Sequence, residues 1–299
     1  MLVSYLKDFH PYAKSSWRFV ATVVPAVLII AYYCHRKKQE RLLENIWPLS
    51  KKSGAYLFLL LLRSFFGCSA VLLQYYSLKY MSLADSSTVA YSSPVFVSIL
   101  AYFFLGEPFG IFSFLSTLIA LAGVACITRP PFITGEKLDL ELVVGVCFAF
   151  MCTIFRGVAI VIVRYLKKVH YSVVLFGFGT FGMVQSLVLA WSYQVMDLPN
   201  TPIDITLTVG MGLLSCVGQI CLVLALKAEN AGPVALVRTC DVVFAFIWQM
   251  VFLRKIPDFY SVLGGCVVLL GVLLAAFRKY IETLDPTHSH RRWFGFVLN

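Results

Sequence analysis

Five ionisable side chains lie inside long apolar stretches of the sequence, where a charge is costly and usually has a function. They are four arginines and one acid: Arg18, Arg63, Arg156, Arg238 and Asp241. Arg63 and Arg156 lie more than two helical turns from the ends of their stretches, with no acid three or four positions away. A guanidinium binds carboxylates and phosphates through paired hydrogen bonds. The excess of positive charge predicts that Arg63 and Arg156 contact an organic anion, unless another helix supplies their counterion.

The other three charges have simpler structural interpretations. Arg238 and Asp241 are three residues apart and can pair on one face of a helix. That pair is either a structural ion pair or a gate, and Arg238 is also a candidate contact for the anion. Arg18 lies near the start of its apolar stretch, so we expect its side chain to extend toward the helix end.

Polar side chains also interrupt one apolar stretch near its middle. Tyr91 and Ser92 precede Pro94, and proline kinks a helix because it has no backbone N–H to donate. A kinked, polar helix is suited to line a cavity, so Tyr91 and Ser92, with Gln219 from a later stretch, are predicted solute contacts. Pro94 and Glu107, at the end of this stretch, are predicted to be structural or gating residues. Hydrogen bonding between neighbouring helices is the alternative explanation.

The sequence contains no constellation that predicts catalysis or a cofactor. The five histidines lie in loops or in the C-terminal tail, and no Walker loop, zinc-binding motif or nucleophile elbow is present. The nine cysteines form no C-x-x-C pair and are expected to be free thiols in apolar surroundings. We therefore expect no enzyme activity, no metal, no cofactor and no ATP-driven step on this chain.

The composition places these residues in a membrane. Hydrophobic residues make up 60% of the 299 residues and charged residues only 13%, whereas soluble domains carry about 25% charged residues. A cytosolic enzyme, a disordered chain and a nucleic-acid binder are excluded despite the net charge of +10. Nine apolar stretches are long enough to span a bilayer. They are residues 16–34, 54–79, 82–105, 109–128, 141–164, 171–194, 203–226, 232–253 and 257–277.

Lysine and arginine are distributed unequally between the two sets of helix ends. Fourteen flank the ends that include the loop 35–53 and the C-terminal tail, and seven flank the opposite ends. The excess of positive charge predicts that the tail, residues 281–299, is cytosolic. The bilayer is a partner in either case, and both the plasma membrane and the endomembranes of the ER and Golgi stay open.

An internal repeat relates the two halves of the sequence. An offset of 148 residues places Phe96 on Phe244 and Gly123 on Gly271. A second match, Leu6-Lys7 with Leu166-Lys167, has an offset of 160. We predict a first repeat at 1–132, lacking most of its first helix, and a second at 139–280. Restoring that helix gives ten spans in two five-helix units that cross the bilayer in opposite senses, an arrangement that places a solute site near the midplane.

Several sequence strings resemble the drug/metabolite transporter superfamily, EamA type: MSLAD at 81–85, YSSPVF at 91–96 and FLGEP at 104–108. KAENAGPV at 227–234 and RTCDVVFAF at 238–246 resemble the G subfamily of solute carrier family 35. The resemblance implies an all-α bundle of ten helices in two inverted EamA-type repeats, with a central cavity and transport of an organic solute. Many relatives in the wider family carry nucleotide sugars, while carboxylates fit the arginines of this sequence better.

The sequence thus predicts a transporter that moves a small organic anion, such as a carboxylate, by alternating access. A nucleotide-sugar transporter and a non-transporting membrane protein that regulates another protein are the alternatives. A membrane enzyme acting on lipid is disfavoured, because no histidine pairs with an acid inside a span. A homodimer is compatible with the sequence, and no nucleic-acid partner is expected.

Overall fold

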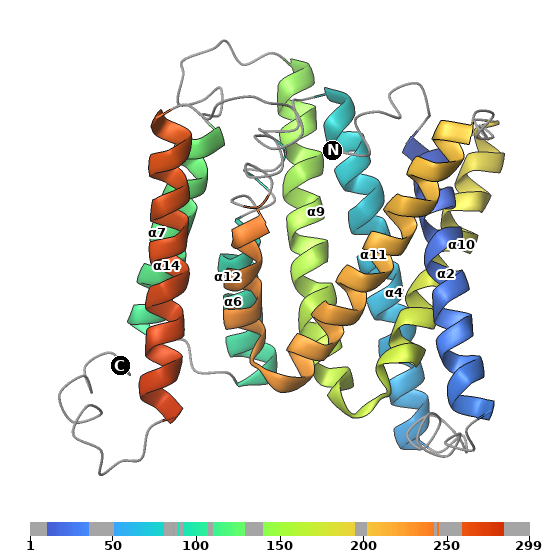
Figure 1. The fold of residues 1–299 in the computed structure, drawn as a ribbon, viewed down its shortest axis with the longest axis horizontal. Coiled ribbons are helices and arrows are strands. Elements are labelled where there is room, and N and C mark those ends of the chain that lie inside the picture. Colours follow the sequence, from blue (N-terminus) through green and yellow to red (C-terminus); the bar gives the residue numbers. More distant parts are fainter. Residues whose placement is uncertain are drawn as a thin grey trace. The chain divides into compact units, whose positions relative to one another are not determined.

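Nearly every described residue of the chain is helical. The structure is a computed structural model and describes residues 11–35, 51–80, 86, 89, 92–106, 110–128, 140–194, 202–241, 244 and 259–283. Its α-helices are α2 (Pro11–His35), α4 (Lys51–Tyr80), α6 (Ser93–Leu105), α7 (Ile111–Thr128), α9 (Leu140–Tyr165), α10 (Tyr171–Ser192), α11 (Pro202–Ala228), α12 (Ala231–Val237) and α14 (Phe259–Thr283). Two short 3₁₀ turns, η1 (Leu166–Lys168) and η2 (Arg238–Cys240), follow α9 and α12 (Figure 1).

These helices confirm the all-α prediction, and each of the nine predicted stretches overlaps one of them. Five spans are long and apolar enough to cross a bilayer: Ser15–His35, Ser53–Tyr80, Val143–Lys168, Tyr171–Ser192 and Pro202–Ala228. Three shorter apolar segments lie in α6, α7 and α14. The part of the chain that the structure describes contains no tenth α-helix.

Proline and glycine set the ends of α6. Pro94 lies in its first turn, where the absent N–H would have had no helical partner. Gly106 ends the helix with a left-handed backbone (φ 64°), and its N–H donates to the carbonyl of Ala101. The predicted kink at Pro94 therefore coincides with the start of a described helix, and most of residues 81–91 lie outside the described part.

The helices pack into two compact units, and each unit combines segments from both halves of the sequence. Unit 1 contains Met1–Tyr76 and Val158–Glu229, and unit 2 contains Ser77–Gly157 and Asn230–Asn299. The helices α4 and α9 therefore each contribute to both units. These units describe packing, whereas the predicted repeats at 1–132 and 139–280 describe similarity of sequence, so the repeat boundaries stay a prediction.

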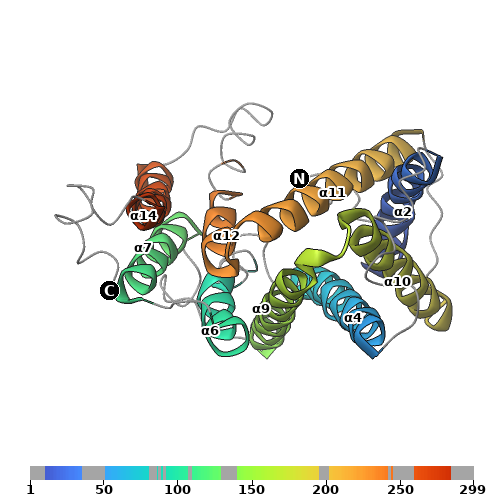
Figure 2. The ribbon, with the colours of Figure 1, turned by 90° about the horizontal axis from the view of Figure 1, so that it is seen from below.

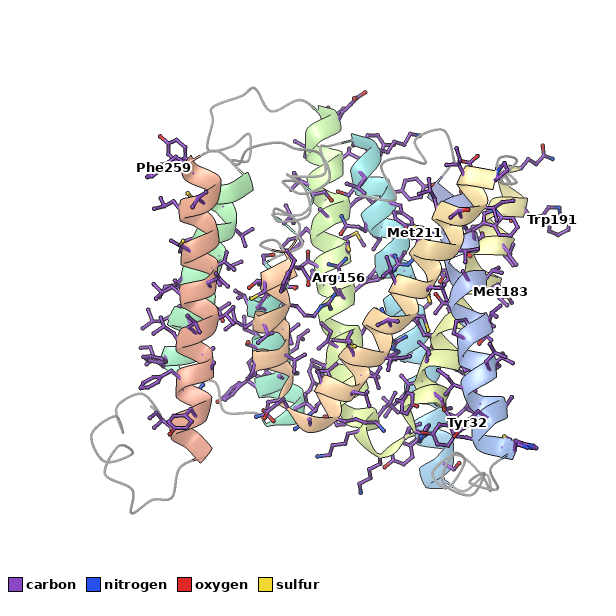
Figure 3. All side chains as sticks on the ribbon, viewed as in Figure 1. Tyr32, Arg156, Met183, Trp191, Met211 and Phe259 are labelled. Atoms are coloured by element: carbon purple, nitrogen blue, oxygen red, sulfur yellow. The ribbon has the colours of Figure 1, made fainter. Side chains whose placement is uncertain are left out.

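In unit 1, α2 packs against both α10 and α11 (Figures 1 and 2). Phe19 is fully buried and packs edge-to-face on Phe178, with ring centroids 5.4 Å apart. Gly182 allows this approach, because a Cβ there would lie 2.6 Å from the Phe19 ring. Aromatic side chains lie at both ends of the unit, as membrane interfaces favour: Tyr32 at the end of α2 and Trp191, 78% exposed, at the end of α10 (Figure 3).

In unit 2, α7 and α14 lie side by side (Figures 1 and 2). Gly123 lies at their closest approach. An added Cβ would lie 2.6 Å from the backbone nitrogen of Val268 and 2.7 Å from the carbonyl oxygen of Gly264. Small residues at a helix interface are the usual means by which membrane helices pack closely.

The same contacts recur at the offset of 148 residues that the sequence predicted. A Cβ on Gly271, the equivalent of Gly123, would lie 2.8 Å from the carbonyl oxygen of Ser116 and 2.9 Å from the nitrogen of Ala120. Ser116 and Ala120 are the equivalents of Gly264 and Val268. Because the contacting residue numbers fall on one helix as they rise on the other, α7 and α14 are antiparallel and related by an approximate twofold axis.

We expect Gly123→Ala to destabilise the α7–α14 pair. The new Cβ meets backbone atoms of α14 and forces the helices apart, a form of overpacking that costs about 1–3 kcal/mol. Gly265→Ala is the matched control, because a Cβ there has nothing within 4 Å and improves helix propensity by about 0.5–1 kcal/mol. Thermal unfolding of the detergent-solubilised variants measures both; an unchanged Tm for Gly123→Ala would contradict this packing.

Candidate functional site

Arg63 lies near the middle of the span in α4 and is 3% exposed. It is ten residues, or about 15 Å, from the start of the span at Ser53, half the thickness of the hydrocarbon layer. Its Nη2 donates a 2.9 Å hydrogen bond to Oε1 of Gln219 on α11. Its guanidinium carbon lies 4.1 Å from the ring centroid of Phe178 on α10. Two helices of unit 1 therefore hold one guanidinium, by an amide and by a cation–π contact.

Two nitrogen atoms of Arg63 have no hydrogen-bond partner in the part of the chain that the structure describes. Its Nε and Nη1 are buried and have no hydrogen-bond partner among the described residues. An unmet buried donor costs about 1–3 kcal/mol, and more when it is charged. A group in this condition is a candidate contact for an acceptor that the described residues do not supply.

Arg18 of α2 belongs to the same region of unit 1. Its Nε donates to Oγ of Ser215 on α11 at 3.0 Å, and its Nη1 donates to the hydroxyl of Tyr75 on α4 at 3.3 Å. The side chain is half-buried. The expectation that Arg18 extends toward the helix end is therefore wrong: the two hydroxyls offer it partners inside the unit.

Two residues on one face of α11 accept hydrogen bonds from the two arginines. Ser215 and Gln219 are four residues apart and so lie one above the other, about 6 Å apart. Both are half-buried and border the exposed face of α11, where Leu214 and Val217 are 66% and 58% exposed. A Cβ on the adjacent Gly218 would have nothing within 4 Å. Ser215 and Gln219 therefore lie beside a surface of α11 that the other described residues leave uncovered.

No carboxylate of the described part of unit 1 lies close along α11 to these arginines. Its acids are Asp204, in the first turn of α11, and Glu229, which directly follows the helix. Along the helix axis they are about 15 Å from the nearer of Ser215 and Gln219. The described part of this region therefore carries two positive charges, and no carboxylate lies close to them along α11. A bound anion would stabilise such an arrangement of charges.

The second group of predicted charges lies in unit 2. Arg156 of α9 donates from Nη2 to the sulfur of Cys152 at 3.5 Å (Figure 3). Asp241 interacts electrostatically with both Arg238 and Arg156. A negative charge from outside α9 therefore lies near enough to Arg156 to interact with it, as the structural alternative allowed. The predicted pairing of Arg238 with Asp241 stays a prediction.

The chain changes its helical geometry at this group. α12 ends at Val237, and Arg238 begins the 3₁₀ turn η2. The hydroxyl of Thr239 donates to the carbonyl of Leu236 at 2.7 Å, which competes with the regular helical bonds. Short 3₁₀ segments inside helical stretches often mark hinges.

The start of α6 holds the polar residues predicted for a cavity wall. The hydroxyl of Ser92 donates to the carbonyl of Val89 at 2.6 Å, and the hydroxyl of Thr153 on α9 reaches the same carbonyl at 3.2 Å. Ser92 is therefore used locally, next to α9. Tyr91 and Glu107 lie outside the described residues, so their predicted roles stay predictions.

A cluster of polar side chains closes one end of unit 1. Arg164 donates from Nη1 to the carbonyls of Leu226 and Lys227 at 2.8 and 3.2 Å, the usual position for a cation at a helix C-terminus. His170 caps α10: its Nδ1 accepts from the N–H of Ser172 and lies 2.7 Å from the hydroxyl of that residue. Burial, and then the charge of Lys227, lower the pKa of His170.

We expect acid to destabilise this end of unit 1 through His170. A lowered pKa means that the unfolded chain takes up the proton first, so the stability is complete above about pH 6.5 and declines as the pH falls. Protonation also removes the acceptor that caps α10. His170→Asn keeps a capping acceptor without a titration. Thermal unfolding at about pH 5 and about pH 7.5 should show a smaller decrease in Tm for this variant than for the unmodified protein; equal decreases would contradict the role of His170.

The described residues contain neither a candidate metal site nor a disulfide. No group of three or more His, Cys, Asp or Glu side chains there could hold a metal ion. All nine cysteines are free thiols.

Among the sequence-predicted contacts, Arg63 and Gln219 are brought together in unit 1, and Arg156, Arg238 and Asp241 in unit 2. Sequence reasoning missed Arg18, Ser215 and Phe178 as members of the unit 1 site. The available signal was the spacing of Ser215 and Gln219, which places two polar side chains on one face of an otherwise apolar helix.

Comparisons with known proteins agree with this architecture. The model of the EamA-like transporter family matches residues 1–129 and 143–277. Solute carrier family 35 member G1 of Mus musculus is 34% identical over 236 residues, or 77% of this chain and 64% of that protein. The Homo sapiens protein of the same name is 32% identical over 290 residues, or 95% of this chain and 76% of that protein.

Two further matches are more distant. The pseudopaline exporter CntI of Pseudomonas aeruginosa is 28% identical over 74% of this chain and 75% of its own length. A protein crystal structure superposes with a TM-score of 0.75 at 17% identity and covers 92% of this chain and 91% of its own. That superposition shows a shared fold. The model of the EamA-like transporter family matches most of the chain, and the long apolar helices agree with it. This multi-pass membrane protein therefore belongs to the EamA-like transporter family.

Proposed function

We propose that this chain transports a small organic anion, such as a carboxylate, across a membrane by alternating access. The observation that carries the proposal is the buried guanidinium of Arg63, whose Nε and Nη1 have no partner among the described residues. Membership of the EamA-like transporter family and similarity to a protein named as an exporter support transport. The charge of the site supports an anion as the solute.

The electrostatics of the site favour a carboxylate over a neutral solute. Arg18 and Arg63 hold two positive charges against hydroxyl, amide and aromatic groups, none of which neutralises them. A carboxylate would accept from the free donors of Arg63 and would compensate the charge. A neutral sugar or a cation would leave the charge uncompensated.

The charges of unit 2 fit a gate better than a solute contact. Asp241 interacts electrostatically with Arg156 and Arg238, and the 3₁₀ turn begins at Arg238. We infer that this group reports or controls the conformation of unit 2. The excess of Lys and Arg at the helix ends that include Arg164, Lys167 and Lys168 supports a cytosolic position for those ends and for the C-terminus.

Uptake by the purified full chain in proteoliposomes tests the proposal. Saturable uptake of labelled succinate, with none of choline or glucose, is the expected result. Uptake of UDP-glucose in place of succinate would instead favour a nucleotide-sugar transporter. The absence of flux for every compound would favour a non-transporting membrane protein.

A further inference from the structure

We propose that Arg18 and Arg63 form a two-point anion site that selects solutes with two negative charges over solutes with one. The inference rests on the proposed function and adds Arg18 as a residue that determines specificity. It starts from the anchoring of both guanidinium groups to α11, at Ser215 and Gln219.

The two anchors lie close together on α11 and hold both charges in one region of unit 1. Residues four apart on a helix are neighbours on one face, about 6 Å apart. Cys68 of α4 interacts electrostatically with both Arg18 and Arg63, so both guanidinium groups lie near one buried thiol. Two acidic groups on one small solute could each bind one of these neighbouring guanidinium groups.

Each arginine is also held from a second side, so the site is formed before the solute arrives. The hydroxyl of Tyr75, which is 7% exposed, accepts from Arg18, and the ring of Phe178 covers the face of Arg63. A planar guanidinium stacked on a ring keeps its N–H groups in the plane for hydrogen bonding. Lysine would not reproduce this arrangement, because its ammonium is a compact charge on a flexible stem.

The two arginines contribute differently. Arg63 is 3% exposed and has donors with no partner among the residues that the structure describes, so it can bind the acidic group that any anionic solute offers. Arg18 is half-buried and donates to two neutral hydroxyls. These hydroxyls do not compensate its positive charge, whereas a carboxylate would. A solute with a single carboxylate satisfies Arg63 alone. A second carboxylate compensates the second positive charge, and its binding at Arg18 gives the selectivity.

The test compares succinate with butyrate, which share a four-carbon backbone and differ by one carboxylate. The full chain in proteoliposomes should show a ratio of Vmax/KM for succinate over butyrate of about 10 or more, because one charge-assisted contact typically corresponds to at least a tenfold difference. Arg18→Gln should reduce this ratio to near 1, whereas Arg63→Gln should reduce uptake of both acids. Lys167→Gln removes an exposed positive charge from the same unit and should keep the unmodified ratio.

Each outcome separates this inference from the proposed function. Uptake of both acids with no preference for succinate, or an equal loss of both in Arg18→Gln, would overturn the two-point site and leave anion transport standing. Uptake of neither acid by the unmodified chain would contradict the proposed function itself. If Arg18→Gln does not fold, the ratio of Vmax/KM for succinate over butyrate is measured in the unmodified chain and in Arg18→Lys. Equal uptake of the two acids by the unmodified chain overturns the inference.

Discussion

Arg63→Gln is expected to raise the KM for succinate uptake by about 10- to 100-fold. Glutamine keeps a polar side chain near Gln219 but removes the charge and the donors that have no partner among the described residues. The loss corresponds to one or two charge-assisted hydrogen bonds, at about 1.5–3 kcal/mol each, and 1.4 kcal/mol is a factor of ten. Initial uptake rates over a range of succinate concentrations provide the measurement.

Two further variants make this result specific. Lys167→Gln is the matched control, since it removes an exposed positive charge from the same unit. Arg63→Lys keeps the charge without the planar face that stacks on Phe178, so an intermediate KM is expected. An unchanged KM in Arg63→Gln, with normal protein in the membrane, would remove Arg63 from the binding site.

Gln219→Glu is expected to lower the apparent affinity for succinate at least about tenfold without harming the fold. The new carboxylate has nearly the shape of the amide and would lie at the 2.9 Å contact with Nη2 of Arg63. It would form an internal ion pair and compete with the solute anion for the same guanidinium. Close charge pairs show coupling energies of about 1.5–7 kcal/mol, so a loss of at least about tenfold in apparent affinity is expected.

The stability of this variant separates competition from misfolding. Because the added acid compensates a buried positive charge, the Tm of Gln219→Glu should equal or exceed that of the unmodified protein. Gln219→Met removes the acceptor without adding a charge and should have a smaller effect on uptake. A decrease in Tm that accompanies the loss of affinity would indicate that Gln219→Glu disrupts the packing of unit 1 instead.

Local signals predicted most of the fold from the sequence. The helix ends follow proline, glycine and basic residues, such as Gly106 after α6 and Pro202 at the start of α11. The offset of 148 residues paired Gly123 with Gly271, and the structure shows both at one antiparallel interface. These features depend on short-range geometry and on small residues, both of which are visible in sequence patterns.

The membership of the site was harder to predict, because it depends on contacts between distant helices. Arg63 and Gln219 were both candidates, but their hydrogen bond joins residues 156 positions apart. Arg18 was assigned to a helix end from its position alone, whereas Ser215 and Tyr75 hold it inside unit 1. Asp241 interacts electrostatically with Arg156 from a distant part of the sequence, which no spacing rule within one helix could identify.

The 3₁₀ turn at Arg238 illustrates a second limit of sequence reasoning. The residues around it, with a valine before and a threonine after, are compatible with a continuous helix. The hydroxyl of Thr239 instead donates to the carbonyl of Leu236, and the helix tightens where the charges lie. Whether a helix tightens at such a residue depends on competition between side-chain and backbone donors for the same carbonyl. A hydropathy pattern does not reveal this competition.

Equilibrium binding of labelled succinate to the purified full chain tests the central claim, that the buried guanidinium of Arg63 binds the solute. The account predicts saturable binding to the unmodified protein, a dissociation constant at least about tenfold higher in Arg63→Gln, and no change in Lys167→Gln. Equal dissociation constants for the unmodified protein and Arg63→Gln, with both correctly folded, would contradict it.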